Sequence, residues 1–131
     1  MNIPSLSCKI EMFCIVNPSE SIEKIEIAIS NIFPYSIIKN NNFSINAQSK
    51  ELRSFEKIYQ FIQNNKLQKN YLRSLEDNLQ GNTTWFYLNK QAAFVEQIAI
   101  CEESDESPLG PIKVIISSSN IDAIIDWIVF D

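Results

Sequence analysis

The chain has 131 residues, of which 45% are hydrophobic, and its formal net charge is −5. The length fits one domain spanning residues 1–131, and a composition with only two glycines and five prolines excludes a loop-rich or disordered chain. The mild acidity opposes indiscriminate binding to nucleic acid or to anionic membranes.

The first predicted element is a strand from Cys8 to Val16. Apolar and polar side chains alternate at its start, which is the pattern of a strand with one buried face. Phe13 and Ile15 interrupt the polar positions. The far end of this strand is therefore expected to be covered on both sides.

A helix is predicted to follow, from Asn17 to about Ile32. Asn17 suits the N-cap, Pro18 the first helical position and Glu20 the capping-box position. Isoleucines and an alanine recur at helical spacing on one face. Pro34 ends the helix.

Two short strands and two helices come next. Tyr35–Ile38 and Phe43–Ala47 are the strands, and the asparagine-rich turn Lys39–Asn42 joins them, because Asn tolerates left-handed conformations. The spacing of apolar residues predicts helices over Ser49–Gln63 and Leu67–Leu79.

Thr83 to Ile100 is strand-like throughout. One strand of that length would measure about 60 Å, so the segment is expected to fold back as a hairpin. Asn89–Gln91 is the predicted polar tip, with Asn89 in a left-handed conformation. A charged loop, Cys101–Ser107, and a rigid turn, Pro108–Pro111, are expected to follow.

The last elements are a strand, Ile112–Ile116, and a helix with its isoleucines inward, starting at about Ile121. The resulting order is β-α-β-β-α-α-β-β-β-α. It predicts an α+β fold of two layers, in which helices pack against a mostly antiparallel or mixed sheet.

Residue types argue against catalysis. The chain has no histidine, which removes the commonest general base and metal ligand. Its glycines, Gly81 and Gly110, form no phosphate-binding loop, and its cysteines have no metal-ligand spacing. We therefore expect no enzyme, no cofactor and no metal. Four acids between Glu102 and Glu106 are read as a solvated loop rather than a Ca²⁺ or Mg²⁺ site.

Cysteine usage and the N-terminus bear on the compartment. Cys8, Cys14 and Cys101 are interpreted as buried thiols of a reducing cytoplasm, although a disulfide stays open for a hyperthermophile. The N-terminus lacks the pattern of a secretory signal, and no apolar run is long enough for a membrane helix. The prediction is a soluble, cytoplasmic protein without membrane contact.

Positive charge is concentrated in one segment. Between positions 50 and 73 there are six basic residues against two acidic ones, a net charge of +4 in a chain of −5. On the two predicted helices these cations form ridges opposite the apolar stripes. Such ridges suit the phosphates of a nucleic acid, although exposed helix faces often carry Lys and Arg without any ligand. The candidate phosphate-binding residues are Lys50, Arg53, Lys57, Lys66, Lys69 and Arg73.

Lys90 is a weaker candidate. At the predicted hairpin tip it could touch a phosphate, or it could be only the polar end of a turn. Its replacement by Ala is then expected to leave folding intact. The chain shows no glycine-aromatic motif of an RNA-recognition sheet, so base stacking on the sheet is not predicted.

Three stretches resemble a known family: NPSE with its following helix, YLNKQAAFVEQI and PLGPIKV. The family is archaeal and uncharacterised, commonly described as RNA-binding and predicted to be an exosome-associated subunit. The resemblance spans about Ile10 to Trp127. It implies a non-enzymatic protein with a fold similar to the large-subunit ribosomal protein that binds five-S RNA. The family tends to have a small residue, often Gly, where this chain has Glu96.

Two functions follow as hypotheses. The first is an RNA-binding protein that contacts the phosphates of structured or double-stranded RNA. The second is a protein-interaction module of an RNA-processing assembly that does not bind RNA itself. A homodimer through an uncovered edge strand is compatible with either.

Overall fold

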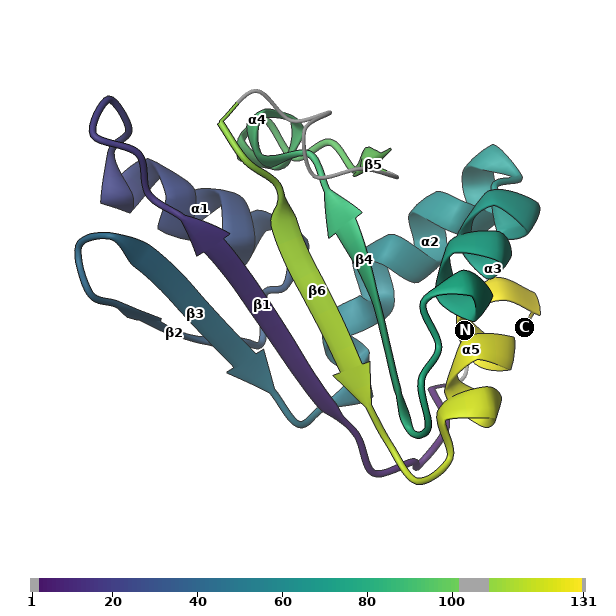
Figure 1. Cartoon of the computed structure of the whole chain (residues 1–131). Helices are drawn as coiled ribbons and strands as arrows, with labels where there is room; N and C mark the ends of the chain where they lie inside the picture. The colour runs from purple at the N-terminus through teal and green to yellow at the C-terminus, as the bar shows by residue number, and fades with distance from the viewer. Residues whose placement is uncertain (1–2, 102–108, 131) are drawn as a thin grey trace.

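The computed structural model of the protein describes residues 3–101 and 109–130. Six strands in this part of the chain form one sheet in the order β2-β3-β1-β6-β4-β5, and each neighbouring pair is antiparallel (Figure 1). The strands are β1 (Lys9–Ile15), β2 (Ile37–Asn40), β3 (Ser44–Ser49), β4 (Thr83–Leu88), β5 (Ile100–Cys101) and β6 (Ile112–Ser117).

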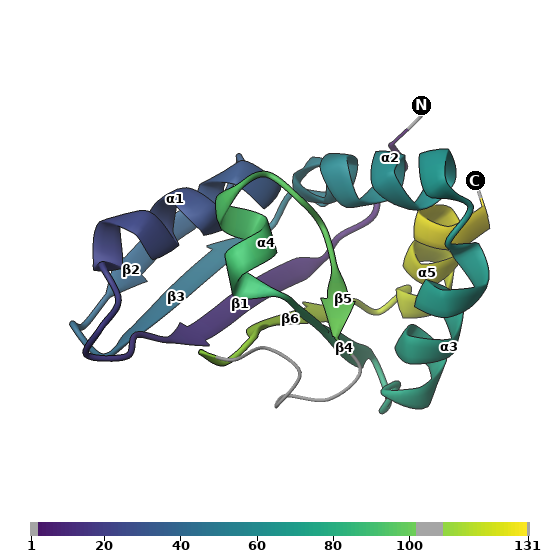
Figure 2. The same ribbon diagram turned by 90° about the horizontal axis from the view of Figure 1, so that it is seen from above.

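The helices lie on one side of this sheet. Figure 2 shows α1, α4 and α2 along one face, with α3 and α5 grouped beside α2 near β4. The helices are α1 (Ile22–Ile32), α2 (Glu56–Asn65), α3 (Gln68–Asp77), α4 (Lys90–Phe94) and α5 (Ile121–Phe130), and a 3-10 helix, Leu52–Phe55, precedes α2. The predicted α+β class and the predicted element order are confirmed, with α4 as an addition.

The core lies between the sheet and the helices. Alternate side chains of the central strands point into it, among them Ile10 of β1 and Val114 of β6, both fully buried. Phe55 joins three elements there, because its ring packs edge-on against Phe33 and tilted against Phe86 of β4, at centroid distances of 5.8 Å and 6.2 Å. The inward isoleucines predicted for α5 are all buried.

The opposite face of the sheet, turned toward the viewer in Figure 1, has none of the described helices across it. Phe13 and Ile15 lie on this open face with 39% and 54% of their surfaces exposed. The prediction that both sides of this strand end are covered is therefore wrong. Apolar residues at outward positions marked an exposed surface here, not a second core.

The first helix begins later than its sequence signals indicate. Ser21 is the N-cap, and its side chain accepts the Lys24 N–H, whereas Asn17 and Glu20 belong to a preceding turn. The predicted N-cap at Asn17 is therefore wrong. The Glu20 carboxylate nevertheless accepts the Asn17 main-chain N–H at 3.0 Å, as a capping box would have it.

The helix predicted over Ser49–Gln63 is also shorter in the structure. Strand β3 continues to Ser49 because Gln48 and Ser49 pair with Glu11 and Ile10 of β1. Regular α-helix starts only at Glu56. The predicted turn Lys39–Asn42 is confirmed only in part, because Lys39 and Asn40 belong to β2, whereas Asn42 has the expected left-handed conformation with a φ of 74°.

The segment after β4 folds back, but not as a hairpin tip. Asn89 has a φ of −70° and caps α4, where its side chain accepts the Ala92 N–H at 2.8 Å. The chain then returns as β5, in which Cys101 pairs with Tyr87. The predicted reversal is confirmed, whereas the polar tip and the left-handed Asn89 are wrong. Two alanines and a capping Asn favour a turn of helix instead.

No helix among the described residues is long and apolar enough to span a membrane. Cys101 belongs to β5, and the rest of the predicted charged loop, with Pro108 at the start of the predicted turn, lies outside the described residues.

Candidate functional site

All six cations of the basic segment, defined here as residues 50–73, are exposed. They do not form two regular helical ridges. Lys50 follows the end of β3, Arg53 lies in the 3-10 helix and Lys57 in α2. Lys66 caps α2 in a left-handed conformation with a φ of 55°, so only Lys69 and Arg73 share one helix, α3. Both predicted ridges are therefore wrong in their geometry, while the exposure of their residues is as expected.

The first half of the segment is engaged with neighbouring groups. The Arg53 guanidinium lies 4.0 Å from the Tyr35 ring centroid and 3.2 Å from a Glu51 carboxylate oxygen. The Lys57 ammonium donates to the main-chain oxygen of Asn31, at the end of α1, at 2.6 Å. These contacts hold the Arg53 and Lys57 side chains against the protein and restrict their movement toward a ligand.

The second half is the better candidate for a ligand. Lys69 and Arg73 point outward from α3, whose buried side is formed by Tyr71 and Leu75. Within the described residues, neither Lys66 nor Lys69 has an ion pair with a carboxylate. Arg73 and Trp85 of β4 line one pocket of about 240 Å³, so this end of the basic segment adjoins the sheet.

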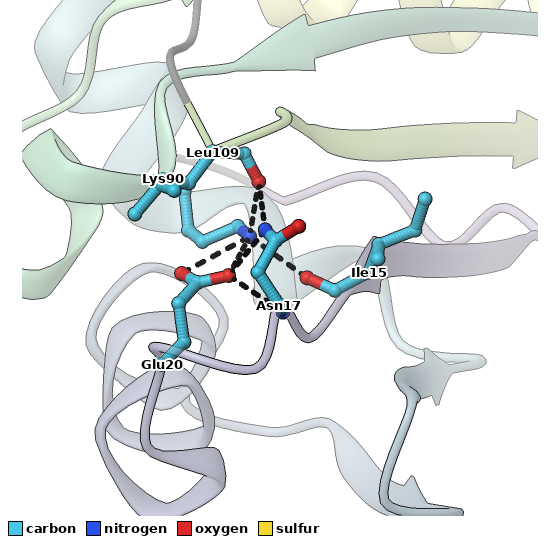
Figure 3. A network of polar contacts seen from close by, with 5 residues as sticks. All are labelled: Ile15, Asn17, Glu20, Lys90 and Leu109. Carbon is cyan, nitrogen blue, oxygen red and sulfur yellow. Dashed lines mark hydrogen bonds and ion pairs between the residues drawn. The ribbon is translucent and has the colours of Figure 1, made fainter.

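Lys90 lies in the interior, with only 3% of its side chain exposed. Its ammonium donates to the main-chain oxygens of Ile15 and Leu109, each at 2.8 Å, and to both carboxylate oxygens of Glu20 at 3.0 Å and 3.2 Å (Figure 3). The prediction that Lys90 is an exposed tip residue is wrong. Because the buried ammonium already donates to four acceptor oxygens, we exclude Lys90 from the candidate RNA contacts.

Asn17 completes this network at its exposed side. Its side-chain amide donates to Glu20 at 2.7 Å and to the Leu109 oxygen at 2.8 Å. The network therefore joins the end of β1, the turn before α1, the start of α4 and the segment leading into β6. Its role is to fasten four chain segments, and we name it the Lys90 network.

Burial acts to raise the pKa of Glu20, but hydrogen bonds from Asn17 and Lys90 and the charge of Lys90 outweigh it, so the pKa lies below its ordinary value. A carboxylate with a lowered pKa stabilises the fold above its unfolded-state pKa of about 4.3. This contribution is lost as the pH falls through the lower pKa of the folded protein.

We therefore expect the gap in melting temperature between wild type and Glu20→Gln to be constant near neutral pH and to narrow below about pH 4.3. Thermal unfolding followed by circular dichroism from pH 7 to 3 measures it. Glu76→Gln, which removes an exposed carboxylate of α3, is the matched control. Its melting temperature should differ little from that of the wild type at every pH measured. A Glu20→Gln gap that widens in acid would contradict the assignment.

Cys8, Cys14 and Cys101 form no disulfide, and Cys8 is only partly buried, unlike the other two. Burial raises the pKa of the Cys14 thiol to about 11, which keeps it protonated and unreactive. Within residues 3–101 and 109–130, no three Cys, Asp or Glu side chains are placed to hold a metal ion.

Glu96 has a positive φ of 61°. A left-handed backbone is what Gly adopts without steric cost. The small residue expected at this place from the family resemblance therefore has a backbone reason, independent of any approach to RNA.

Sequence reasoning missed the aromatic side chains on the open face. Trp85 and Tyr87 lie at alternate positions of β4, with ring centroids 5.0 Å apart, and Lys113 of β6 lies 4.7 Å from the Trp85 centroid. The available signal was the alternation in TTWFYL, which places Thr84, Phe86 and Leu88 inward and the other aromatics outward.

Comparison with known proteins gives a consistent result. A family model described as RNA binding matches residues 9–118. A UPF0201 protein of Sulfurisphaera tokodaii is 37% identical over 117 residues, which cover 86% of this chain and 81% of that protein. A UPF0201 protein of Saccharolobus solfataricus is 31% identical over 124 residues, covering 92% and 86%.

Solved structures agree with these relatives. The crystal structure of a UPF0201 protein from Methanococcus jannaschii has a TM-score of 0.77 at 29% identity, over 92% of each chain. A second UPF0201 crystal structure has a TM-score of 0.80 at 26% identity, over 94% of each. The predicted family resemblance is thereby confirmed, and the chain belongs to the archaeal UPF0201 family, whose model is described as RNA binding.

Proposed function

We propose that this protein binds RNA without catalysing a reaction, and that it contacts RNA phosphates through the basic segment. The observation that carries the proposal is charge segregation: the six exposed cations give residues 50–73 a net charge of +4 in a chain of −5. Family membership supports RNA as the ligand.

The second half of the segment supplies the main contacts in this proposal. Lys66, Lys69 and Arg73 are exposed around the junction of α2 and α3, and the first two have no carboxylate partner among the described residues. Arg53 and Lys57 already have protein partners, so their contribution is smaller. Structured RNA suits this surface because a duplex presents a regular array of phosphates.

Binding driven by phosphate contacts should weaken steeply with salt. If six contacts form, the affinity for a duplex of about 16 base pairs should fall roughly a thousandfold between 50 and 200 mM salt. Fluorescence anisotropy of labelled RNA at several salt concentrations gives the slope of log affinity against log salt concentration. We expect the double variant Lys66→Glu/Lys69→Glu to bind roughly tenfold or more weakly, with a slope reduced by about 2.

The matched single variants are Lys69→Glu and Lys24→Glu. Both remove an exposed lysine of a helix and change the net charge equally, but Lys24 belongs to α1, outside the basic segment. Equal losses of duplex affinity in the two variants would show that binding depends only on the net charge of the protein. Absence of duplex binding by the wild type at low salt would refute the proposal.

An assembly role is the second candidate. The edge strand β2 exposes 64% of Ile37, and Phe43, before β3, exposes 77% of its surface. Exposed apolar groups at a sheet edge favour contact with another protein or a second copy. Affinity purification with and without nuclease separates the two candidates: partners that resist nuclease, together with no direct RNA binding, would favour the assembly role.

A further inference from the structure

The register of the sheet brings lysines and aromatic residues into one row on the open face. Lys39 of β2 is opposite Asn46 of β3, which is opposite Phe13 of β1. Phe13 is in turn opposite Lys113 of β6, and Lys113 is opposite Tyr87 of β4. Directly opposite residues share a face, so these five side chains cross five neighbouring strands, a width of roughly 19 Å. We call them the face row.

The adjacent row contributes a second set of side chains. Glu11 of β1 is opposite Gln48 of β3 and Ile115 of β6, and Ile115 is opposite Trp85 of β4. Trp85 packs beside Tyr87 and under the Lys113 ammonium. Between β1 and β2 the face is hollowed by a groove of about 440 Å³, and its lining includes Phe13, Lys39, Asn46 and Gln48.

The described strand positions of the open face carry a net positive charge although the protein is acidic. They carry three lysines, Lys9, Lys39 and Lys113, and one carboxylate, Glu11. The net charge of these positions is thus +2, in a chain of −5. Glu11 lies 3.8 Å from the Lys9 ammonium, and both side chains are about half exposed, so this pair is weak and open to competition.

This composition differs from that of a protein-docking patch. The centre of a protein interface is depleted in Lys and Glu, whereas here lysines and amides separate the aromatic residues. Unpaired nucleotides need this alternation, since bases stack on aromatic rings and the backbone between them requires cations. Side-chain amides such as that of Asn46 can bond base edges exposed in a single strand.

The geometry points to a second RNA contact: we infer that the open face binds an unpaired RNA segment. Bases stack on Phe13 and Tyr87, and Lys39 and Lys113 contact the phosphates between them. This inference rests on the proposed function and extends it, because Trp85 and Arg73 line one pocket and thereby connect the face to the basic segment. The preferred ligand is then a duplex continued by a single strand.

The test compares a single-stranded RNA of about 12 nucleotides with a blunt duplex of about 16 base pairs. Phe13→Ala and Tyr87→Ala should each weaken single-strand binding by roughly 5- to 100-fold and leave duplex binding almost unchanged. Phe94→Ala is the matched control, because Phe94 is 41% exposed against 39% for Phe13 but belongs to α4 on the helical side. It should change neither affinity.

Tryptophan fluorescence gives a second readout that does not depend on the Phe13→Ala and Tyr87→Ala variants. Single-stranded RNA should quench the fluorescence of Trp85, whereas Trp127, only 4% exposed and stacked on Tyr59, should respond little. The quenching should therefore disappear in Trp85→Phe. Quenching that persists in this variant would contradict the inference.

The outcomes separate the inference from the function beneath it. If the wild type binds neither the duplex nor the single strand, the proposed function and the inference are both overturned. Duplex binding with single-strand affinity unaffected by Phe13→Ala and Tyr87→Ala would overturn the inference alone. A wild-type dimer in sedimentation that Phe13→Ala makes monomeric would show that a second copy covers the face, which also overturns it.

Discussion

Replacing Lys90 by Met should lower the free energy of unfolding by about 3–5 kcal/mol. The substitution keeps the length of the side chain but removes the ammonium that neutralises Glu20, whose side chain is only 9% exposed. It also removes the ammonium donor of the Ile15 carbonyl oxygen and one of the two donors of the Leu109 carbonyl oxygen, which keeps the Asn17 amide. Chemical denaturation of wild type and variant measures the loss of unfolding free energy. The dependence of that free energy on denaturant concentration should be the same for both proteins.

Lys24→Met is the control, because it makes the same substitution at an exposed position of α1 and should cost less than about 0.5 kcal/mol. The double variant Lys90→Met/Glu20→Leu removes both charges. Its loss of unfolding free energy should be smaller, by about 1–3 kcal/mol, than the sum of the losses of Lys90→Met and Glu20→Leu. A loss below about 1 kcal/mol for Lys90→Met would contradict a buried, fully bonded ammonium.

Phe55→Ala should cost a similar amount, about 3–5 kcal/mol, and lower the melting temperature by roughly 10–20 °C. Phe55 is fully buried and packs against Phe33 and Phe86, so its removal opens a cavity between the 3-10 helix, α1 and β4. Differential scanning calorimetry gives both quantities.

Phe43→Ala removes the same side chain where 77% of its surface is exposed, and it should be nearly neutral. Phe55→Leu should fall between the two, because a smaller cavity remains. Equal melting temperatures for Phe55→Ala and Phe43→Ala would mean that the aromatic cluster is not part of the stabilising core.

Hydrophobic periodicity predicted the fold class well, because alternation and helical spacing are local. Its errors at element ends came from pairing between distant segments. Strand β3 reaches Ser49, where it pairs with Ile10 of β1. Helix α1 begins only at Ile22, after a turn in which Glu20 is held by Lys90. Nothing near either residue in the sequence indicates such partners.

The site was predicted unevenly for a similar reason. Exposure of charged residues follows from composition, so the exposure of the cations of the basic segment was predicted correctly, while their contact with RNA stays a prediction. The burial of Lys90 depends on a carboxylate 70 positions away and on two main-chain oxygens, which carry no sequence signal. The face row requires the strand order, which decides that Phe13 and Tyr87 lie on either side of Lys113.

The central claim is that RNA contacts local positive surfaces of an acidic protein. The most direct test is an amide chemical-shift footprint on the ¹⁵N-labelled wild type, with an RNA hairpin that continues into a single strand. We expect the largest shifts at residues 66–73 and along the face row, with little change at Lys24 and Phe94. Shifts centred on α1 and α4, or no shifts at low salt, would contradict it.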